Sequence, residues 1–328
     1  MSLLRAFKPA LRWASPGGSH GRLSVLIFHR VLPVRDPLFP QEIDARAFDK
    51  VCRWARAMFN ILPLDQAAQR LAEGTLPARA LAITFDDGYA DNHDVALPIL
   101  ARHGLPAAFF IATGYLDGGR MFNDSIIESV RLTQRPGLDL RDMFEDDQAR
   151  YALSSMAQRR AAIDNIIPRI KYFQVDERNK LVEMIAHRAD VKLPDDLMMT
   201  SAQVVAMRRA GMQIGAHTVS HPILARLSAD DVRREMTESR RFLEQLLGER
   251  VGLFAYPNGK PELDYNASCV AAVREGGFDA AFTTAWAAGH RKTSSFEIPR
   301  FTPWDRSGWR FGWRMLNNLR ASRPQPEK

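Results

Sequence analysis

The stretch "LAITFDDGYADN", residues 81–92, places two carboxylates side by side where an apolar run ends. The run 80–86 is almost continuously apolar up to Asp86, which is typical of a strand buried in a parallel sheet. Consecutive strand residues point to opposite sides, so Asp86 and Asp87 are expected to have different roles rather than share one proton. Gly88 then gives the backbone the freedom to turn away from the strand.

Runs of the same kind recur along the chain. Strands are also predicted at 23–29, 107–112, 212–217, 252–257, 279–284 and 296–301. Amphipathic helices are predicted between the strands, at 45–58, 64–73, 92–103, 201–210, 229–247 and 265–275. The helix 229–247 is the best marked, because Ser228 and Asp231 form a capping-box start and Gly248 provides a C-terminal stop. Seven such units predict an α/β fold, a distorted (β/α) barrel of about seven strands that is closed or nearly closed.

The region 117–199 interrupts this alternation. It contains almost no strand signal, is rich in charged residues and is predicted to form several helices, one of them over 147–170. We therefore expect a helical insertion in one loop of a barrel whose two halves are 22–116 and 200–302. The flanking segments are a basic amphipathic one at 1–21 and a basic aromatic one at 303–328.

The composition is that of an ordinary globular protein. The 328 residues are 46% hydrophobic and 25% charged, enough for one large domain or two modest ones. The two cysteines, Cys52 and Cys269, lie far apart, which argues against a disulfide framework or a thiolate zinc site. Arg5, Lys8 and Arg12 interrupt the N-terminal apolar residues, so no signal-peptide core forms, and no run is long enough to span a membrane. A cytoplasmic protein is expected.

The net charge is +7, and the basic excess is concentrated at both termini. Residues 1–13 combine cations with apolar side chains, and residues 304–320 interleave tryptophan with arginine. Such segments suit the interface of an anionic membrane, so peripheral contact with the inner face of a membrane is predicted. The alternative is a helix packed on the barrel with a solvated charged face. Nucleic acid is not an expected partner, because the basic residues form no recognised binding module.

A second group of functional side chains follows another predicted strand, in "GAHTVSHP", residues 215–222. Pro222 disfavours helical geometry at His221, so His217 and His221 are expected where a strand runs into a loop. In a β/α barrel, polar residues at the C-terminal ends of strands face the active site. Two histidines and one carboxylate, with coordination positions left for water, describe a catalytic rather than a structural metal site.

These motifs resemble those of a known family. "TFDDG" at 84–88 and "HTVSH" at 217–221 are similar to the first two motifs of the polysaccharide deacetylases, the NodB-homology family or carbohydrate esterase family 4. "FAYPNG" at 254–259 resembles the form of the third motif found in one branch of that family. The resemblance covers the barrel and not the insertion.

The resemblance implies a set of site residues. Asp87, His217 and His221 match the positions that bind a divalent metal, usually zinc, and Asp86 matches the general base. The backbone N–H that helps to hold the oxyanion matches Asn258, although the aromatic residue usual at that position is missing.

Two further departures from the family pattern affect the prediction. The commonest third motif has an arginine that positions the base, and the aligned residue here is Ala255. The late histidine that normally acts as general acid is also missing, because the last strand reads "IPRF" and contains Arg300. His29, which ends the first strand, is the predicted substitute acid; the alternative is a histidine hydrogen-bonded for structural reasons. Arg300 either replaces the missing arginine or forms a plain salt bridge, and Tyr256 either lines the pocket or packs.

The predicted function is a metal-dependent hydrolase that removes N-acetyl groups from an amino sugar of a polysaccharide or lipid-linked glycan precursor. One alternative is an O-acetyl esterase using the same site, and another is a catalytically inactive glycan-binding barrel. A non-haem iron oxygenase uses the same ligand set, but the alternating β/α pattern argues against the all-β architecture usual there.

Overall fold

The computed structural model describes residues 6–173 and 175–321, so the predictions that concern Leu3, Leu4, Arg5 and the tail 322–328 lie outside the described residues. The chain forms two compact units. Within the described residues, the barrel unit comprises 6–34, 43–116 and 199–321, and the insertion unit comprises Arg35–Glu42 and Asp117–Met198.

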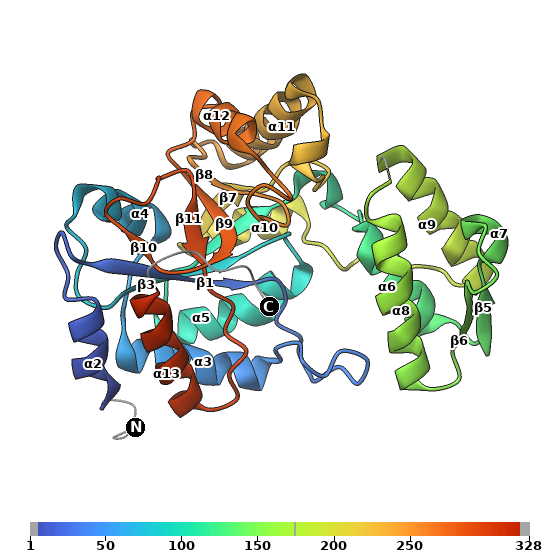
Figure 1. The fold of residues 1–328 in the computed structure, drawn as a ribbon, viewed down its shortest axis with the longest axis horizontal. Coiled ribbons are helices and arrows are strands. Elements are labelled where there is room, and N and C mark those ends of the chain that lie inside the picture. The colour runs from blue at the N-terminus through green and yellow to red at the C-terminus, as the bar shows by residue number, and fades with distance from the viewer. Residues whose placement is uncertain (1–5, 174, 322–328) are drawn as a thin grey trace. The chain divides into compact units, whose positions relative to one another are not determined.

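The barrel unit is built on one sheet (Figure 1). Its parallel strands are β1 (Arg22–Phe28), β3 (Ala80–Phe85), β4 (Ala108–Ile111), β7 (Gln213–Ala216), β8 (Leu253–Ala255), β9 (Ala280–Trp286) and β11 (Ile298–Arg300). They pair in the order β1-β3-β4-β7-β8-β9-β11. All seven predicted strands are confirmed.

The two ends of this sheet meet. The residue after β11, Phe301, donates its N–H to the carbonyl of Val25 at 2.7 Å and accepts the N–H of Ile27 at 3.1 Å. Two short strands, β2 (Asn60–Ile61) beside β3 and β10 (Gly289–His290) antiparallel to β1, were not predicted. The result is a nearly closed barrel, as the sequence predicts.

Helices cover the sheet. They are α2 (Phe7–Ala14), α3 (Ala45–Met58), α4 (Leu64–Glu73), α5 (Leu97–His103), α10 (Ser201–Arg209), α11 (Ala229–Leu247), α12 (Ala267–Glu275) and α13 (Gly308–Arg320), with short turns η1 (Asn92–Ala96), η2 (Thr113–Tyr115) and η3 (Leu224–Arg226). Helices α3, α4 and α11 have the predicted bounds. As expected, the Ser228 hydroxyl accepts the N–H of Asp231, and Gly248 ends α11 with φ of 69°.

The strands alternate between two apolar layers, as the period of two requires. In β3, Leu81, Ile83 and Phe85 belong to the large outer core under the helices. Ala80 and Ala82 belong to a second cluster with Ala108, Phe110, Ala255 and Phe282, which fills the barrel. Alternate residues of a strand point the same way, so the next side chains that point inward are Thr84 in β3 and Asp86 directly after it. The strand period therefore directs Asp86 to the inside of the barrel, at its C-terminal end.

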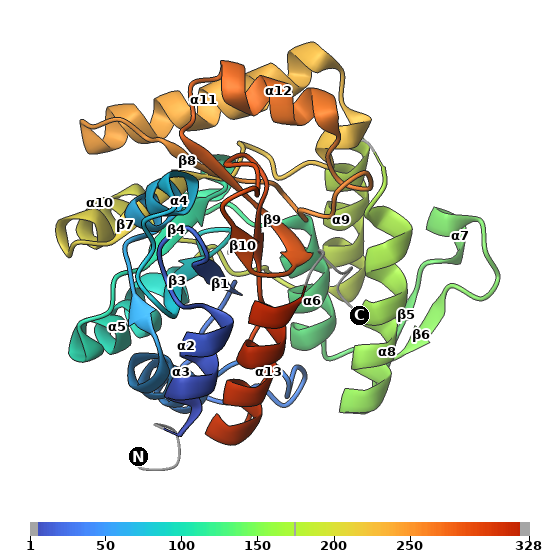
Figure 2. The ribbon, with the colours of Figure 1, turned by 60° about the vertical axis from the view of Figure 1, so that its left-hand side comes forward.

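The insertion unit, which is mainly helical (Figure 2), has its own core of apolar side chains. It contains α6 (Phe122–Leu132), β5 (Gly137–Asp139), α7 (Arg141–Phe144), β6 (Arg150–Ala152), α8 (Met156–Ile170) and α9 (Val175–Ala189). The prediction of one helix over 147–170 was wrong at its start, because 150–152 pair with β5 and Ser155 caps a helix that begins at Met156. Residues 35–42, which the sequence assigned to the barrel, belong here: Arg131 donates to both oxygens of Asp36, at 3.0 and 2.7 Å.

Candidate functional site

The first pair of site residues consists of Asp86 and Arg300. Both side chains point to the inside of the barrel, and each residue is at most 2% exposed. The Arg300 guanidinium donates one hydrogen bond to each Asp86 oxygen, both at 2.6 Å. Its Nε–H donates to the Thr283 carbonyl at 3.0 Å, and Nη1, which also bonds Asp86, donates to the Thr84 hydroxyl at 3.4 Å. Arg300 therefore holds Asp86 in one orientation, which a surface salt bridge would not do.

Asp87, the next residue, has an unusual backbone. Its φ is +76°, and Gly88 follows with φ of +90°. Positive φ also occurs in the other two motif loops, at Thr218, His221 and Asn258. Such conformations cost free energy in residues other than glycine, most of all in a β-branched one, and are characteristic of functional sites. In this chain they turn the motif loops sharply at the ends of β3, β7 and β8.

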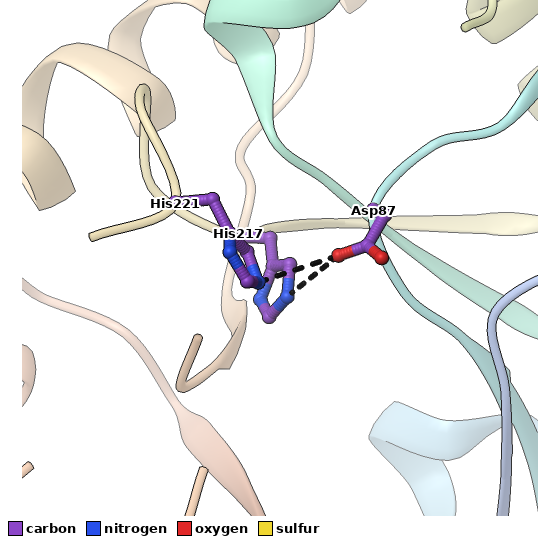
Figure 3. Close-up of side chains that lie close together, drawn as sticks. All are labelled: Asp87, His217 and His221. Carbon is purple, nitrogen blue, oxygen red and sulfur yellow. Dashed lines mark ion pairs between the residues drawn. The ribbon is translucent and has the colours of Figure 1, made fainter. Parts of the chain in front are cut away.

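Asp87, His217 and His221 come together, as the sequence predicts (Figure 3). The Nε2 atoms of both imidazoles lie 3.4 Å from the Asp87 Oδ1 atom. The second ring nitrogen of His217, Nδ1, lies 2.7 Å from the Ala255 carbonyl oxygen and donates to it. That hydrogen bond fixes the ring and leaves Nε2 for a ligand. Ala255, the residue that replaces the family's arginine, thus contributes its backbone to the site.

The charges of these buried groups are coupled. Burial alone would raise the pKa of Asp86, but the Arg300 guanidinium and then the His217 ring outweigh it and lower the pKa. Burial also opposes ionisation of Asp87, yet the His217 and His221 rings beside its carboxylate hold the pKa of Asp87 far below its usual value. Burial lowers the pKa of His221 to about 4, so this ring is neutral at pH 7.

The donor set fits one divalent cation. The three ligand atoms all lie within 4.8 Å of one another, and two ligands at zinc-like distances and a tetrahedral angle are about 3.4 Å apart. Asp87 Oδ1 is buried and accepts no hydrogen bond from the described residues, although a buried carboxylate oxygen normally has a partner. A cation between the three side chains would supply that partner. Asp87, His217 and His221 could therefore hold a metal ion.

Glu235 on α11 supports the loop between the two histidines, and sequence reasoning missed it. Its Oε2 accepts the N–H groups of Val219 and Ser220 at 2.8 and 2.9 Å, and its Oε1 accepts the Ser220 hydroxyl at 2.6 Å. Three bonds from a neighbouring helix fix a loop that contains two positive φ values. A glutamate on an amphipathic helix gives no signal of such a role in the sequence.

His29 is exposed at the end of β1. The residue before it, Phe28, pairs with Phe85 and accepts the N–H of Asp86 at 2.9 Å, so His29 lies at the same edge of the sheet as the two carboxylates. Two residues of the first quoted stretch hold its loop. The Asn92 amide donates to the His29 carbonyl at 2.8 Å, and Asp91 accepts the N–H of Val31 at 3.0 Å. The position agrees with a role in the reaction, and the role itself stays a prediction.

The remaining two predicted residues follow β8. Asn258 is partly buried with φ of +57°, a conformation that asparagine adopts more easily than an aromatic residue. Tyr256 is fully buried, stacks on Tyr265 with ring centroids 4.0 Å apart and donates its hydroxyl to the Phe296 carbonyl at 3.0 Å. Of the two possibilities left open by the sequence, Tyr256 therefore packs and does not line the site.

Comparison with known proteins identifies the family of the chain. Residues 73–165 and 174–281 match the family model described as polysaccharide deacetylase. The Bacillus subtilis (strain 168) protein YxkH, named for the same family, is 20% identical over 281 residues, which cover 85% of this chain and 70% of that protein.

Solved structures share the fold. The Streptococcus pyogenes deacetylase PplD, solved in complex with acetate, is 18% identical with a TM-score of 0.59, covering 91% of this chain and 98% of that chain. IcaB from Ammonifex degensii is also 18% identical, with a TM-score of 0.60, covering 90% and 97%. These identities show the fold alone, whereas the family model covers more than half of the sequence. The chain therefore belongs to the polysaccharide deacetylase family.

Proposed function

We propose that this protein is a metal-dependent hydrolase that removes N-acetyl groups from an amino sugar of a polysaccharide or of a lipid-linked glycan precursor. One observation carries the proposal. A buried carboxylate, Asp86, is fixed by Arg300 and lies 3.9 Å from His217, within a cluster of Asp87, His217 and His221 that suits a cation. A base next to a cation site is the arrangement that hydrolysis of an amide requires.

The residues then have separate tasks. A bound divalent cation, for which zinc is the best match to this ligand set, supplies Lewis acidity and lowers the pKa of water. Asp86 accepts the proton of the water that adds to the acetyl carbon, while the N–H of Asn258 donates to the developing oxyanion. His29 gives a proton to the sugar nitrogen as the C–N bond breaks. The products are acetate and a free amine.

The leaving group distinguishes an N-acetyl from an O-acetyl substrate. An amine is a poor leaving group unless it is protonated, whereas an alcohol leaves an ester with less assistance. His29, exposed beside the two carboxylates, is available for that protonation and favours the amide. Replacing His29 with alanine should therefore slow hydrolysis of an N-acetyl sugar much more than that of its O-acetyl analogue. Equal losses on both substrates would argue against the assigned proton donor.

The proposal extends to where the protein works. We place it in the cytoplasm, in peripheral contact with the inner face of an anionic membrane, where lipid-linked sugars are assembled. The basic aromatic segments at both ends of the chain support this location. The site belongs to a hydrolase family in a β/α barrel, so an iron oxygenase is not proposed.

Acetate release tests the proposal. Free and lipid-linked N-acetyl sugars and their O-acetyl analogues are incubated with the zinc-loaded protein, with and without chelator. We expect chelator-sensitive acetate release from an N-acetyl sugar. The Asp86→Asn variant should lose turnover and keep its metal content. Turnover that survives this substitution would show that another group is the base. If the wild-type protein neither binds a metal nor releases acetate, the remaining interpretation is a catalytically inactive glycan-binding barrel.

A further inference from the structure

We propose that helices α2 and α13 form a docking surface for an anionic lipid bilayer. The surface, here called the tryptophan face, consists of three tryptophans and three arginines: Trp13, Trp309, Trp313, Arg12, Arg310 and Arg320. This inference gives the proposed membrane contact a defined position on the barrel unit, and it does not depend on catalysis.

The two helices lie side by side on the barrel (Figures 1 and 2). The ring of Phe7, near the start of α2, packs edge-on against Trp309 near the start of α13, with centroids 4.8 Å apart. At the other end, the Arg320 guanidinium lies 5.9 Å from the centre of the Trp13 ring. Contacts at both ends hold the two helices together, and the one between Arg320 and Trp13 joins exposed side chains of both helices.

The outer side of α13 is apolar and cationic. Trp309, Trp313 and Arg320 are four and seven residues apart, so they lie along one side of the helix. Trp13, Trp309 and Trp313 are 75%, 60% and 53% exposed, although tryptophan is normally well buried. Tryptophan and arginine together are typical of the boundary between lipid headgroups and acyl chains.

The inner side of α13 is firmly attached to the barrel. Phe311, Met315 and Leu319 are fully buried in the core. Arg314 donates to Asp305 at 3.0 Å and lies over the rings of Trp286 and Phe301. The tryptophan face is therefore presented by a fixed helix, and binding would need no unfolding.

The charge of this region has one sign. The sequence contains no acidic residue before Asp36 and only Asp305 between residues 301 and 320. Asp305 is paired with Arg314, and its side chain is 1% exposed. The charges that α2 and α13 present are thus positive, which complements anionic headgroups.

Helix α11 provides an internal comparison, because it also packs one side on the barrel. Its outer side has ion pairs between Asp230 and Arg233 and between Asp231 and Arg234. Its one strongly exposed aromatic residue is Phe242, at 38%. A solvated helix of this chain therefore mixes both signs of charge, and the tryptophan face does not.

Sedimentation with vesicles tests the inference. The full chain is mixed with phosphatidylcholine vesicles, with or without 30% phosphatidylglycerol, at low and at high salt. We expect binding to the anionic vesicles, weaker binding at high salt because the charges are screened, and little binding to neutral vesicles. No binding of the wild-type protein to anionic vesicles would overturn the inference.

Two double variants locate the surface. Arg310→Gln/Arg320→Gln should weaken binding to anionic vesicles about fivefold for each arginine removed, and Trp309→Ala/Trp313→Ala should weaken it at least about tenfold. The matched control, Arg241→Gln/Phe242→Ala, removes a cation and an aromatic side chain from α11 and should bind as the wild type does. If both surface variants bind normally, the inference is wrong.

Two measurements distinguish a bilayer from a second copy of the chain and from nucleic acid. If the tryptophan variant converts a dimer to a monomer in sedimentation velocity, the tryptophan face is an interface between copies of the chain. If single-stranded DNA displaces the vesicles from the protein at equal charge, the ligand is nucleic acid. Either result overturns the inference. Unchanged acetate release from a soluble substrate shows that the variants are folded. Vesicle binding without any acetate release would refute the proposed function only.

Discussion

Replacing Arg300 with methionine tests the electrostatics of the site, because it removes the charge and keeps an unbranched side chain. The guanidinium donates two hydrogen bonds of 2.6 Å to Asp86, and the two side chains are 0% and 3% exposed. The substitution leaves a buried carboxylate without its cation. Breaking a buried pair in this way costs about 3–5 kcal/mol of unfolding free energy, a large share of the roughly 5–15 kcal/mol that a domain has.

Tryptophan fluorescence during urea unfolding measures this loss of stability in the barrel unit, to which Arg300 and Asp86 belong. All six tryptophans belong to the barrel unit and none to the insertion unit: Trp13, Trp54, Trp286, Trp304, Trp309 and Trp313. The experiment is done on protein treated with chelator, since a bound cation would add stability by mass action and hide the loss. The expected change is a lower urea midpoint with little change in slope.

The double variant Asp86→Asn/Arg300→Met separates the pair from general packing damage. Each single variant leaves one buried charge unpaired, whereas the double variant leaves none, so its loss of stability should be less than the sum of the two by about 0.5–3 kcal/mol. Arg300→Met should also reduce kcat/KM about 100-fold, because a misplaced base is a poor one, and Arg300→Lys should lose less. Additive stability losses and a near-normal kcat/KM for Arg300→Met would refute the positioning role.

Three other substitutions test the site and the packing inside the barrel. His221→Ala should lose bound zinc in elemental analysis and lose acetate release, while its circular dichroism spectrum stays unchanged; retained zinc would contradict the ligand set. Glu235→Ala should weaken zinc binding about 10–100-fold in competition with a chromophoric chelator, whereas Glu238→Ala, on the exposed side of the same helix, should not. Gly215→Ala puts a Cβ atom 2.5 Å from the Phe110 ring inside the barrel and should cost about 1–3 kcal/mol in urea unfolding; a smaller cost would mean that this ring moves easily.

The architecture of the barrel could be predicted from sequence because its signals are local. Apolar runs bounded by turns predicted the seven parallel strands, and helix caps such as Ser228 predicted helix bounds. The short strands β2 and β10 could not be predicted, because two-residue strands leave no period to detect. The placement of 35–42 with the insertion unit depends on the pairing of Asp36 with Arg131, which are 95 residues apart.

Part of the site was also predictable. The metal cluster was foreseeable because His217 ends a predicted strand, Asp87 and His221 follow predicted strands, and parallel strands bring their C-terminal ends together. Glu235 was not, because its partners are backbone N–H groups of another element. Tyr256 remained ambiguous in the sequence, since a tyrosine at a strand end can face either a pocket or the core.

The sequence left open whether Arg300 replaces the family's arginine or forms a plain salt bridge. The closure of the barrel decides between these alternatives. The family's usual arginine would project from position 255 on β8, whereas Arg300 projects from β11, which lies beyond β9. Ala255 and Ile298 both point into the barrel, so the period of two puts Arg300 inside as well. The interior is narrow enough for a guanidinium from either strand to reach Asp86. The intervening strand β9 supplies the Thr283 carbonyl that accepts the Nε–H of Arg300. The cation beside the base can therefore come from a different strand than the one that contains position 255.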